Sequence, residues 1–409
     1  MNIIHVIRRF SLNEWGGAEE ACLNLAKEQS AKGHNVTILS TNALDGESYS
    51  TVEGVDVYRF NYFYPYLSLN MGQRDKFDLK GGNPISMGLY YYIRTNDVDI
   101  IHVHNKGYLL DVCSVLSKVK NIPIFLTLHG GHVDVPSKET AYFKTLYKRS
   151  INLGRILEIF FKISAKINEL SGVICVGYSE YWNNRKQGVN AKYIPNGINI
   201  DSDTNTEEVD IYKYFNIPRS RRIVLNVARI DSQKNQEVII KSMKYFKDKD
   251  IQFVIVGAVT EKSYLNKLKE ISIELNVSSH LTIVEGIPKG SPYLEALYNS
   301  CEVFILPSRH EPFGIVVLEA WKAKKPVITS EVGGLKRLVT NEEDGIFFDN
   351  KSEVSLANNL KKLLNNPELA SHLGSSGYQK AISTYRWSSI AEEVLSFYKH
   401  ETNKLILQR

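Results

Sequence analysis

Hydrophobic and polar positions alternate in blocks along most of the chain. Short apolar runs rich in β-branched residues are bounded by polar or turn residues, a pattern typical of buried strands. In the first half, the predicted strands span residues 2–7, 35–40, 98–103, 123–128 and 172–176. Amphipathic stretches between them predict helices, such as 17–32, with Gly33 as its C-cap. Strands that alternate with helices indicate βαβ units and a parallel sheet.

The same pattern starts again in the second half. The predicted strands there span residues 222–227, 252–256, 281–284, 303–306 and 326–329, and helices are predicted over 235–246 and 264–275. Between the two sets lies the polar stretch 201–210, whose composition is typical of a linker. We therefore expect an α/β protein with two Rossmann-like, doubly wound domains, 1–196 and 211–387. A C-terminal helix over 388–409 follows, and a return to the first domain is one option for it.

Doubly wound sheets bind ligands beyond the carboxyl ends of their strands, so a cleft between two such domains is the expected active site. The sequence has no G-x-G-x-x-G after the first strand and no G-x-x-x-x-G-K-[ST]. It also has no G-x-S-x-G and no H-E-x-x-H. These absences disfavour classical NAD binding, P-loop nucleotide hydrolysis, α/β-hydrolase chemistry and zinc proteolysis.

Charge and cysteine content narrow the possibilities further. The 409 residues carry 50 Lys and Arg against 45 Asp and Glu, a net charge of +5, which is too mild for a dedicated nucleic-acid binder. The four cysteines, Cys22, Cys113, Cys175 and Cys301, form no C-x-x-C pair, so we expect buried thiols in a reducing compartment and no structural zinc. No run approaches the roughly 18 apolar residues of a membrane span, and the N-terminus lacks a signal-peptide pattern. We expect a cytoplasmic protein.

Three groups of residues follow predicted strands and can carry chemistry. The first is Gly16-Gly17, at a predicted helix start, where backbone N–H groups and the helix dipole favour an anion. An ordinary strand–helix turn is the alternative. The second is Arg229 with Lys234, whose cations suit phosphate oxygens. A solvated surface loop is the alternative there.

The third group is Glu311 and Glu319, within the stretch Pro307-Ser308-Arg309-His310-Glu311-Pro312-Phe313-Gly314 and the apolar run after it. Their spacing of eight is about two helical turns, which allows both carboxylates to lie on one helix face. Burying Glu319 in an apolar run is costly unless it is paired, and hydrogen bonds from sugar or ribose hydroxyls would offset that cost. The alternative is a buried glutamate that the backbone or a lysine satisfies.

Together these residues resemble the family 4 glycosyltransferases, which have the GT-B fold, and the resemblance covers nearly the whole chain. Its most specific element is Glu311 to Glu319 in P-S-x-x-E-P-F-G. The supporting elements are Gly16-Gly17-Ala18-Glu19, His129-Gly130, Ile194-Pro195-Asn196-Gly197, Arg229 with Lys234-Asn235, and Val332-Gly333-Gly334.

The resemblance implies retaining transfer of a hexose-type sugar from a UDP- or GDP-linked donor to a hydroxyl of a glycan or lipid-linked acceptor. The expected context is surface polysaccharide or glycolipid biosynthesis. Neither a metal ion nor a cofactor is implied, because the cations would stabilise the leaving diphosphate themselves. A same-face attack, with the departing phosphate taking the acceptor proton, is the expected mechanism.

The resemblance also assigns roles to individual positions. Arg229 and Lys234 would bind the diphosphate, Glu319 the ribose and Glu311 the transferred sugar. Backbone N–H groups of Gly16, Gly17 and Phe313-Gly314-Ile315 would complete the cradle. Gly286 lies where the family usually places the base. His129 would contact the sugar from the first domain, and the alternative for it is a core histidine that the protein itself satisfies.

The acceptor side gives weaker signals. Residues 60–66 and 88–92 are rich in aromatic side chains, which suit sugar stacking or a protein core equally. Residues 141–167 carry six basic residues against one acid and have apolar residues at helical spacing. A basic amphipathic helix of this kind can bind an anionic membrane face, so we predict peripheral contact at the inner face of the membrane. Packing of this helix on its own sheet is the alternative.

Two other functions remain open from the sequence. A nucleotide-sugar epimerase shares the GT-B fold, but it needs an internal acid–base set that we do not identify. A silent, nucleotide-binding partner subunit has no chemical reason to keep Arg229, Lys234, Glu311 and Glu319 together, so these four residues favour a transferase.

Overall fold

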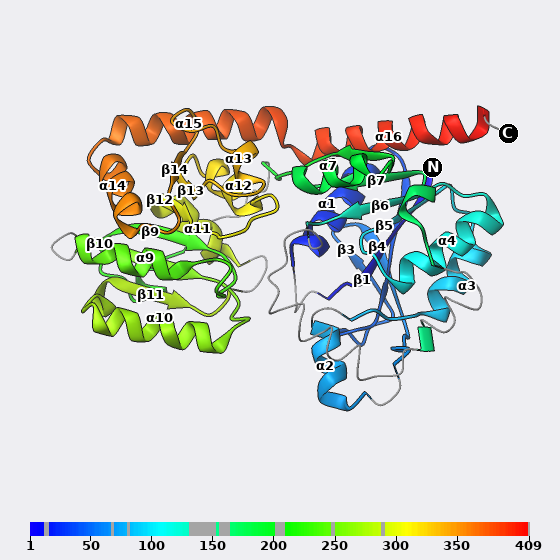
Figure 1. Cartoon of the computed structure of the whole chain (residues 1–409), viewed down its shortest axis with the longest axis horizontal. Helices are drawn as coiled ribbons and strands as arrows, with labels where there is room; N and C mark the ends of the chain where they lie inside the picture. The colour runs from blue at the N-terminus through cyan, green and yellow to red at the C-terminus, as the bar shows by residue number, and fades with distance from the viewer. Residues whose placement is uncertain are drawn as a thin grey trace. The chain divides into compact units, whose positions relative to one another are not determined.

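The computed structural model describes residues 1–11, 16–66, 69–79, 82–130, 153–154, 164–200, 209–246, 250–287 and 291–407. The chain divides into two compact units, which Figure 1 draws with their elements labelled. Unit 1 comprises Met1–Asn196 together with Trp387–Arg409, and unit 2 comprises Gly197–Arg386. The last helix therefore belongs with the first residues of the chain.

Unit 1 is built on an eight-stranded sheet in the order β3-β4-β2-β1-β5-β6-β7-β8. All neighbouring strands pair in parallel except β3 and β4, which form an antiparallel pair at one edge. The strands are β1 (Asn2–Arg9), β2 (Asn35–Thr41), β3 (Tyr49–Val52), β4 (Val55–Phe60), β5 (Ile100–Val103), β6 (Ile124–Leu128), β7 (Gly172–Cys175) and β8 (Ala191–Tyr193).

Helices cover both faces of this sheet, because alternate residues of each strand point to opposite sides. In β1, Ile3 and Ile7 join a core with α1 and α16, whereas Ile4 and Val6 join a core with α3 and α4. The helices of unit 1 are α1 (Gly17–Ala31), α2 (Met71–Leu79), α3 (Met87–Thr95), α4 (Tyr108–Lys120), η1 (Ile167–Glu169), α7 (Tyr178–Lys186) and α16 (Trp387–Leu407).

Unit 2 is built on a six-stranded, fully parallel sheet in the order β11-β10-β9-β12-β13-β14. Its strands are β9 (Arg222–Val227), β10 (Ile251–Val256), β11 (Leu281–Val284), β12 (Cys301–Leu306), β13 (Val327–Ser330) and β14 (Ile346–Phe348). Its helices are α8 (Ile211–Tyr214), α9 (Gln236–Ser242), η2 (Met243–Tyr245), α10 (Lys262–Glu274), η3 (Ser278–His280), α11 (Pro292–Ser300), α12 (Ile315–Lys322), α13 (Leu335–Leu338), α14 (Glu353–Leu364) and α15 (Pro367–Thr384).

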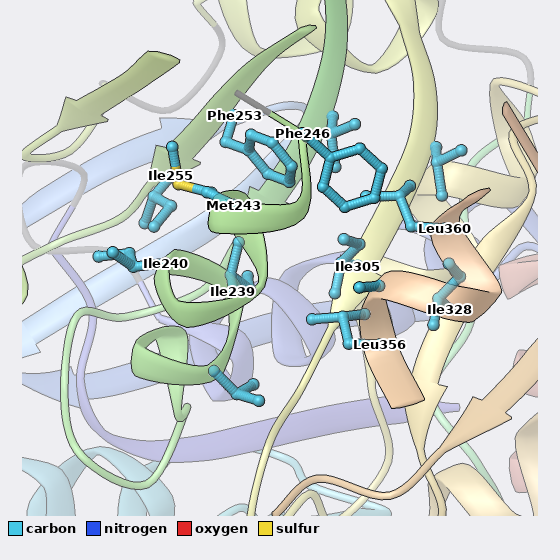
Figure 2. Close-up of a cluster of buried hydrophobic side chains, with 14 of the residues drawn as sticks. Ile239, Ile240, Met243, Phe246, Phe253, Ile255, Ile305, Ile328, Leu356 and Leu360 are labelled. Carbon is cyan, nitrogen blue, oxygen red and sulfur yellow. The ribbon is translucent and has the colours of Figure 1, made fainter. Parts of the chain in front are cut away.

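Strand alternation also creates two cores in unit 2. Phe253 and Ile255 of β10 face α9 and α14, as Figure 2 shows, and α10 contributes to the same cluster. Val254 and Val256 of the same strand pack with α11 and α12 on the other side. Both faces are buried, which explains why the strands appear in the sequence as continuous apolar runs. Because helices cover both faces of the sheet, the polar loops that can bind a ligand lie at the carboxyl ends of the strands.

The predicted α/β class and all ten predicted strands are confirmed, with ends that shift by one or two residues. Gly33 follows α1 with a φ of 83°, as expected of a residue just past a helix end. The pattern did not predict β3, β4, β8 and β14. Of these, β8 and β14 have only three residues each, too few to show a period.

Two expectations from composition can be compared with the structure. All four cysteines are free and buried, as predicted. Among the described residues, no helix combines the length and the apolar character that crossing a bilayer requires. Residues 201–208 of the expected linker lie outside the described residues.

Candidate functional site

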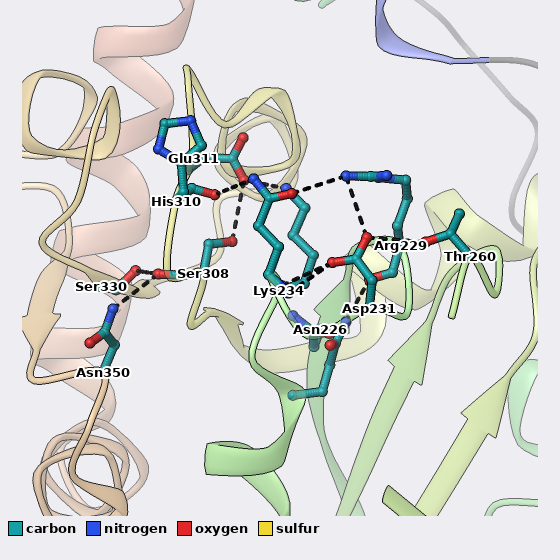
Figure 3. Close-up of polar contacts among 12 residues, drawn as sticks. Asn226, Arg229, Asp231, Lys234, Thr260, Ser308, His310, Glu311, Ser330 and Asn350 are labelled. Atoms are coloured by element: carbon teal, nitrogen blue, oxygen red, sulfur yellow. Dashed lines mark hydrogen bonds and ion pairs between the residues drawn. The ribbon is translucent and has the colours of Figure 1, made fainter. Parts of the chain in front are cut away.

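In unit 2, the loops that follow β9 and β12 meet at a buried ion pair. Nζ of Lys234 lies 2.7 Å from Oε2 of Glu311, and Oγ of Ser308 donates to the same oxygen at 3.3 Å (Figure 3). The Lys234 and Glu311 side chains are only 12% and 11% exposed. Neutralisation by the partner is what makes it possible to bury either charge here.

A local turn aims Lys234 at this point. The carboxylate of Asp231 accepts hydrogen bonds from the backbone N–H groups of Gln233 and Lys234, each at 3.1 Å, which forms an Asx turn. The other Asp231 oxygen accepts from Oγ1 of Thr260 at 3.1 Å. Asn235 then adopts a left-handed conformation, φ 57°, immediately before α9. The Asp–x–x–Lys–Asn order thus fixes both the turn and the direction of the lysine.

The loop after β12 is held on several sides by backbone hydrogen bonds. The N–H of Arg309 donates to the carbonyl of Gln233 at 2.8 Å, which ties the two loops together. The carbonyl of Ser308 accepts from Oγ of Ser330 at 2.5 Å and from Nδ2 of Asn350 at 3.2 Å (Figure 3). Glu311 is therefore presented by a loop whose backbone is fixed from the loops after β9 and β14 and from the end of β13.

Two glycines let the chain after β13 pass against this loop. A Cβ on Gly333 would lie 2.3 Å from the carbonyl oxygen of Glu311, and one on Gly334 would lie 2.1 Å from that of Pro312. The N–H of Gly334 donates to the Glu311 carbonyl at 2.8 Å. Only glycine allows so close an approach of two backbones.

The Glu311 loop ends at the N-terminus of α12. Phe313 is buried, and Gly314 has a φ of 100°, a conformation that favours glycine. The first N–H groups of the helix, beginning at Ile315, lack partners within the helix and lie at the positive end of its dipole. The expected positions 313–315 thus lie at a helix start that suits an anion, close to Glu311 in the sequence.

Arg229 adds a second cation at the end of β9. Its Nη2 lies 3.4 Å from Oδ2 of Asp231 and 3.4 Å from Oε1 of Gln233 (Figure 3). The side chain is 40% exposed, so these contacts orient the guanidinium without burying its charge. Arg229 and Lys234 therefore differ: the first is partly open to solvent, and the second is paired and enclosed.

A tyrosine hydroxyl orients the Glu319 carboxylate. The hydroxyl of Tyr298, on α11, donates to Oε2 of Glu319 at 2.7 Å. Burial and the nearby carboxylate raise the pKa of Tyr298 well above its usual value, so the phenol keeps the proton that it donates. One partner of the half-buried Glu319 carboxylate is thus a neutral hydrogen-bond donor.

The expectation that Glu311 and Glu319 share a helix face is wrong. Helix α12 begins only at Ile315, so Glu311 lies four residues earlier, in the loop. Pro312 and the positive φ of Gly314 are incompatible with a continuous helix through this stretch. Glu311 therefore lies in the loop before α12, whereas Glu319 lies within the helix.

Gly286 follows β11 in an exposed position with a φ of 103°. A Cβ added there would meet nothing within 4 Å, so the backbone is open on that side. The structure thus places Arg229, Lys234, Gly286, Glu311, Phe313, Gly314, Ile315 and Glu319 in unit 2, on loops and helix starts that follow its strands.

Gly16, Gly17 and His129 belong to unit 1. Gly16 is the N-cap of α1 with an extended backbone, and Glu19 in the first turn pairs with Arg9 at 3.1 Å. Nε2 of His129 lies 3.1 Å from Nδ1 of His104, whereas its buried Nδ1 has no hydrogen-bond partner among the described residues. The protein thus satisfies only one of the two ring nitrogens of His129 from this part of the chain.

The structure describes only part of the regions that the sequence predicts for the acceptor side. Tyr64 and Tyr66 are buried in an aromatic cluster with Phe77 and Tyr108, which favours a core role for 60–66. Most of the basic stretch 141–167 lies outside the described residues, so its membrane contact stays a prediction.

Sequence reasoning missed the residues that support the site. Ser308 follows β12, Ser330 ends β13 and Asn350 follows β14, and only the folded sheet brings them together. The role of Asp231 did have a local signal, because an Asp side chain often accepts hydrogen bonds from backbone N–H groups two and three residues further along the chain.

Comparisons with known proteins identify the family. A family model described as Glycosyltransferase Family 4 matches residues 15–202, and one described as Glycosyl transferases group 1 matches residues 210–380. Together they match most of the chain, and the chain belongs to the family 4 glycosyltransferases. The resemblance drawn from its motifs is confirmed.

Relatives and solved structures agree with this assignment. An uncharacterized glycosyltransferase of Methanocaldococcus jannaschii is 27% identical over 392 residues, 94% of each chain. A D-inositol 3-phosphate glycosyltransferase of Corynebacterium glutamicum is 28% identical over 187 residues, 44% of each chain.

Solved structures show the same fold over nearly the whole length. Sucrose-phosphate synthase from Thermosynechococcus elongatus has a TM-score of 0.73 at 21% identity and covers 98% of this chain and 99% of its own. The Anabaena protein HepE, solved with UDP and glucose, has a TM-score of 0.70 at 19% identity and covers 97% of this chain and 98% of its own. The predicted GT-B fold is confirmed.

Proposed function

We propose that this glycosyltransferase moves a hexose-type sugar, with retention, from a UDP- or GDP-linked donor to a hydroxyl of a glycan or lipid-linked acceptor. The observation that carries the proposal is the buried Lys234–Glu311 pair at the carboxyl end of the unit 2 sheet. Such a pair puts a cation for a diphosphate beside a carboxylate for sugar hydroxyls.

The charges suit a departing nucleoside diphosphate. An ammonium group has three donors, so Lys234 can keep one hydrogen bond to Glu311 and direct the others at phosphate oxygens. Arg229 adds a planar fork that matches phosphate geometry. The N-terminus of α12 adds backbone N–H groups. Because the leaving group gains negative charge as the anomeric bond breaks, preorganised cations lower the barrier in the role that a divalent ion fills elsewhere.

The carboxylates suit hydroxyl groups. Both hydrogen bonds described for Glu311 fall on Oε2, and the second oxygen points away from Lys234 in Figure 3. That oxygen would accept from the transferred sugar. Glu319, oriented by Tyr298, would accept from the ribose. The open backbone at Gly286 suits the flat face of a base.

In the proposed step, the bond from the anomeric carbon to the phosphate oxygen breaks, and the acceptor oxygen bonds to that carbon on the same face. The departing phosphate oxygen takes the acceptor proton. A cytoplasmic location, membrane contact through 141–167 and a role in surface polysaccharide or glycolipid assembly stay part of the proposal.

Slow hydrolysis of the donor without acceptor tests the proposal. The protein is incubated with UDP- and GDP-linked hexoses, and release of the nucleoside diphosphate is measured. Release from one donor type, with the anomeric configuration of the released sugar retained at early times, supports it. No release from any donor, together with no nucleotide binding, would point to a different ligand.

A further inference from the structure

A row of histidines crosses three neighbouring strands of unit 1, from the middle of β1 to the carboxyl ends of β5 and β6. His5 in β1 is the register partner of His102 in β5. His104 follows directly after β5, and His129 follows directly after β6. His5, His102 and His104 are fully or almost fully buried, which is unusual for residues that can carry charge.

Three of these histidines form a continuous hydrogen-bonded chain that starts at a glutamine. The side-chain carbonyl oxygen of Gln29, on α1, lies 2.8 Å from Nε2 of His5. Nδ1 of His5 lies 2.9 Å from Nε2 of His104, and Nδ1 of His104 lies 3.1 Å from Nε2 of His129. Each contact joins an Nδ1 to the Nε2 of the next ring.

Burial keeps these rings neutral. It lowers the pKa of His5 and of His129 from 6.5 to about 4, and it holds the pKa values of His102 and His104 well below 6.5. A neutral imidazole has one donor nitrogen and one acceptor nitrogen. In a row of hydrogen-bonded imidazoles, the nitrogen that carries the proton in the first ring therefore determines which nitrogen carries it in every other ring.

The glutamine sets the direction. Because the carbonyl oxygen of Gln29 only accepts, Nε2 of His5 carries the proton and Nδ1 accepts from Nε2–H of His104. Nδ1 of His104 in turn accepts from Nε2–H of His129. The chain therefore ends in an unprotonated Nδ1 of His129, the buried nitrogen without a hydrogen-bond partner among the described residues.

His102 lies beside this row of hydrogen bonds and shares a partner with it, because Tyr398 contacts both His102 and Gln29. Nε2 of His102 lies 2.6 Å from Oγ1 of Thr127, and its Nδ1 lies 2.5 Å from the hydroxyl of Tyr398 on α16. Candidate ligand atoms of His5, His102 and His104 lie within 4.8 Å of one another, close enough to hold a cation. Both ring nitrogens of each already have hydrogen-bond partners, so the geometry favours a hydrogen-bonded network over a metal centre.

We propose that Gln29, His5 and His104 are positioning residues that fix His129 as a hydrogen-bond acceptor for a hydroxyl of the carbohydrate substrate. This inference rests on the proposed function for the identity of the ligand. The tautomer itself is a property of the free protein. Gln29 acts through three hydrogen bonds on His129, and the proposed hydrogen bond from the substrate hydroxyl to His129 is the fourth in the series.

Nitrogen NMR of the free, histidine-labelled full-length protein at pH 7.5 tests the tautomer. His129→Asn identifies the His129 signals by their loss. The inference expects a protonated Nε2 and an unprotonated Nδ1 in His129. A proton on Nδ1 of His129 would overturn it, because the chain would then run in the opposite direction.

Variants of the glutamine test the cause. Gln29→Met removes the acceptor and should mix the two tautomers of His129, whereas Gln29→Glu keeps an acceptor and should preserve the wild-type tautomer. Thr127→Val is the matched control, because it removes a buried hydroxyl from His102 on the same sheet and should leave His129 unchanged. An unaltered His129 in Gln29→Met would overturn the role of Gln29.

Turnover supplies the functional readout. Gln29→Met should lower kcat for donor hydrolysis by up to roughly tenfold, the worth of one hydrogen bond, while nucleoside diphosphate binding stays unchanged. Gln29→Glu should restore kcat. A loss of kcat that Gln29→Glu does not restore would contradict the positioning role. If no nucleotide sugar is turned over, the proposed function fails, while the NMR result still decides the tautomer.

Discussion

Lys234 and Glu311 are 77 positions apart in the sequence, and their charged groups lie 2.7 Å apart in a nearly solvent-free part of unit 2. Each side chain makes the other's burial tolerable, and each carries half of the proposed chemistry. The pair is therefore both a structural element and the centre of the proposed donor site.

Removing one partner should cost more stability than removing both charges. Lys234→Met leaves the Glu311 carboxylate buried without its cation, so we expect a loss of about 3–5 kcal/mol in the free energy of unfolding. Lys234→Met combined with Glu311→Gln leaves two neutral groups and should cost much less. Denaturant unfolding of both variants checks this, and equal losses would show that the pair is not coupled.

Loss of either cation should slow the reaction. Arg229→Ala and Lys234→Ala should each lower turnover by roughly 10²-fold or more, the size seen when one charge-stabilising donor is removed from a transition state. Lys244→Ala is the control, because Lys244 pairs with Glu353 in a more exposed position of the same unit. Full activity in Arg229→Ala or Lys234→Ala would refute the diphosphate role of that residue.

The close passage of Gly334 should be sensitive to a single methyl group. A Cβ there would press on the Pro312 carbonyl, so Gly334→Ala should displace the Glu311 loop and weaken nucleotide binding. Gly46→Ala adds a methyl group where nothing lies within 4 Å and serves as the control. Nucleotide-induced melting shifts measure the effect. A Gly334→Ala protein with the wild-type shift would show that the loop tolerates the displacement.

The buried histidines should make unit 1 sensitive to acid. The folded-state pKa values of His5 and His129, about 4, lie below the ordinary 6.5, so the unfolded chain binds more protons between these values. Stability is thus fully present above pH 6.5 and falls as the pH drops towards 4, by at most about 1.4 kcal/mol per pH unit for each histidine. The polar and titratable groups that face His5 and His129, directly or through a neighbouring ring, are Gln29, His102, His104, Thr127 and Tyr398.

His129→Asn removes one of these titrating groups. The fall in melting temperature between pH 7 and pH 5 should therefore be smaller in this variant than in the wild type. Melting curves at both pH values give the comparison. An identical fall would mean that His129 does not contribute to the acid sensitivity.

The sequence predicted much of the fold because burial on both faces leaves largely apolar runs, such as 252–256 and 303–306, which lie within β10 and β12. It predicted site residues that follow a strand, such as Arg229 and Lys234 after β9. The prediction from sequence was wrong for Glu311 and Glu319. Their spacing of eight suggested one helix face, whereas Pro312 and Gly314 place Glu311 in a loop.

The pattern of hydrophobic and polar positions could not predict contacts between segments that are far apart in the sequence. Tyr298 satisfies Glu319 across 21 residues, and Asn350 supports Ser308 across 42. Neither pairing has a local signal, because it depends on which strands become neighbours. The histidine chain is a similar case: His5 and His102 meet only because β1 pairs with β5 in that register.

Thermal stability with UDP, GDP and ADP, in the wild type and in the Lys234→Met, Glu311→Gln double variant, tests the donor site most directly. A nucleotide at 100 times its dissociation constant adds about 2.7 kcal/mol to stability, which raises the melting temperature measurably. We predict that one nucleotide stabilises the wild type and that this shift is largely lost in the double variant, which still folds. An equal shift in both proteins, or none in the wild type with any nucleotide, would contradict the assignment of Lys234 and Glu311 to the donor site.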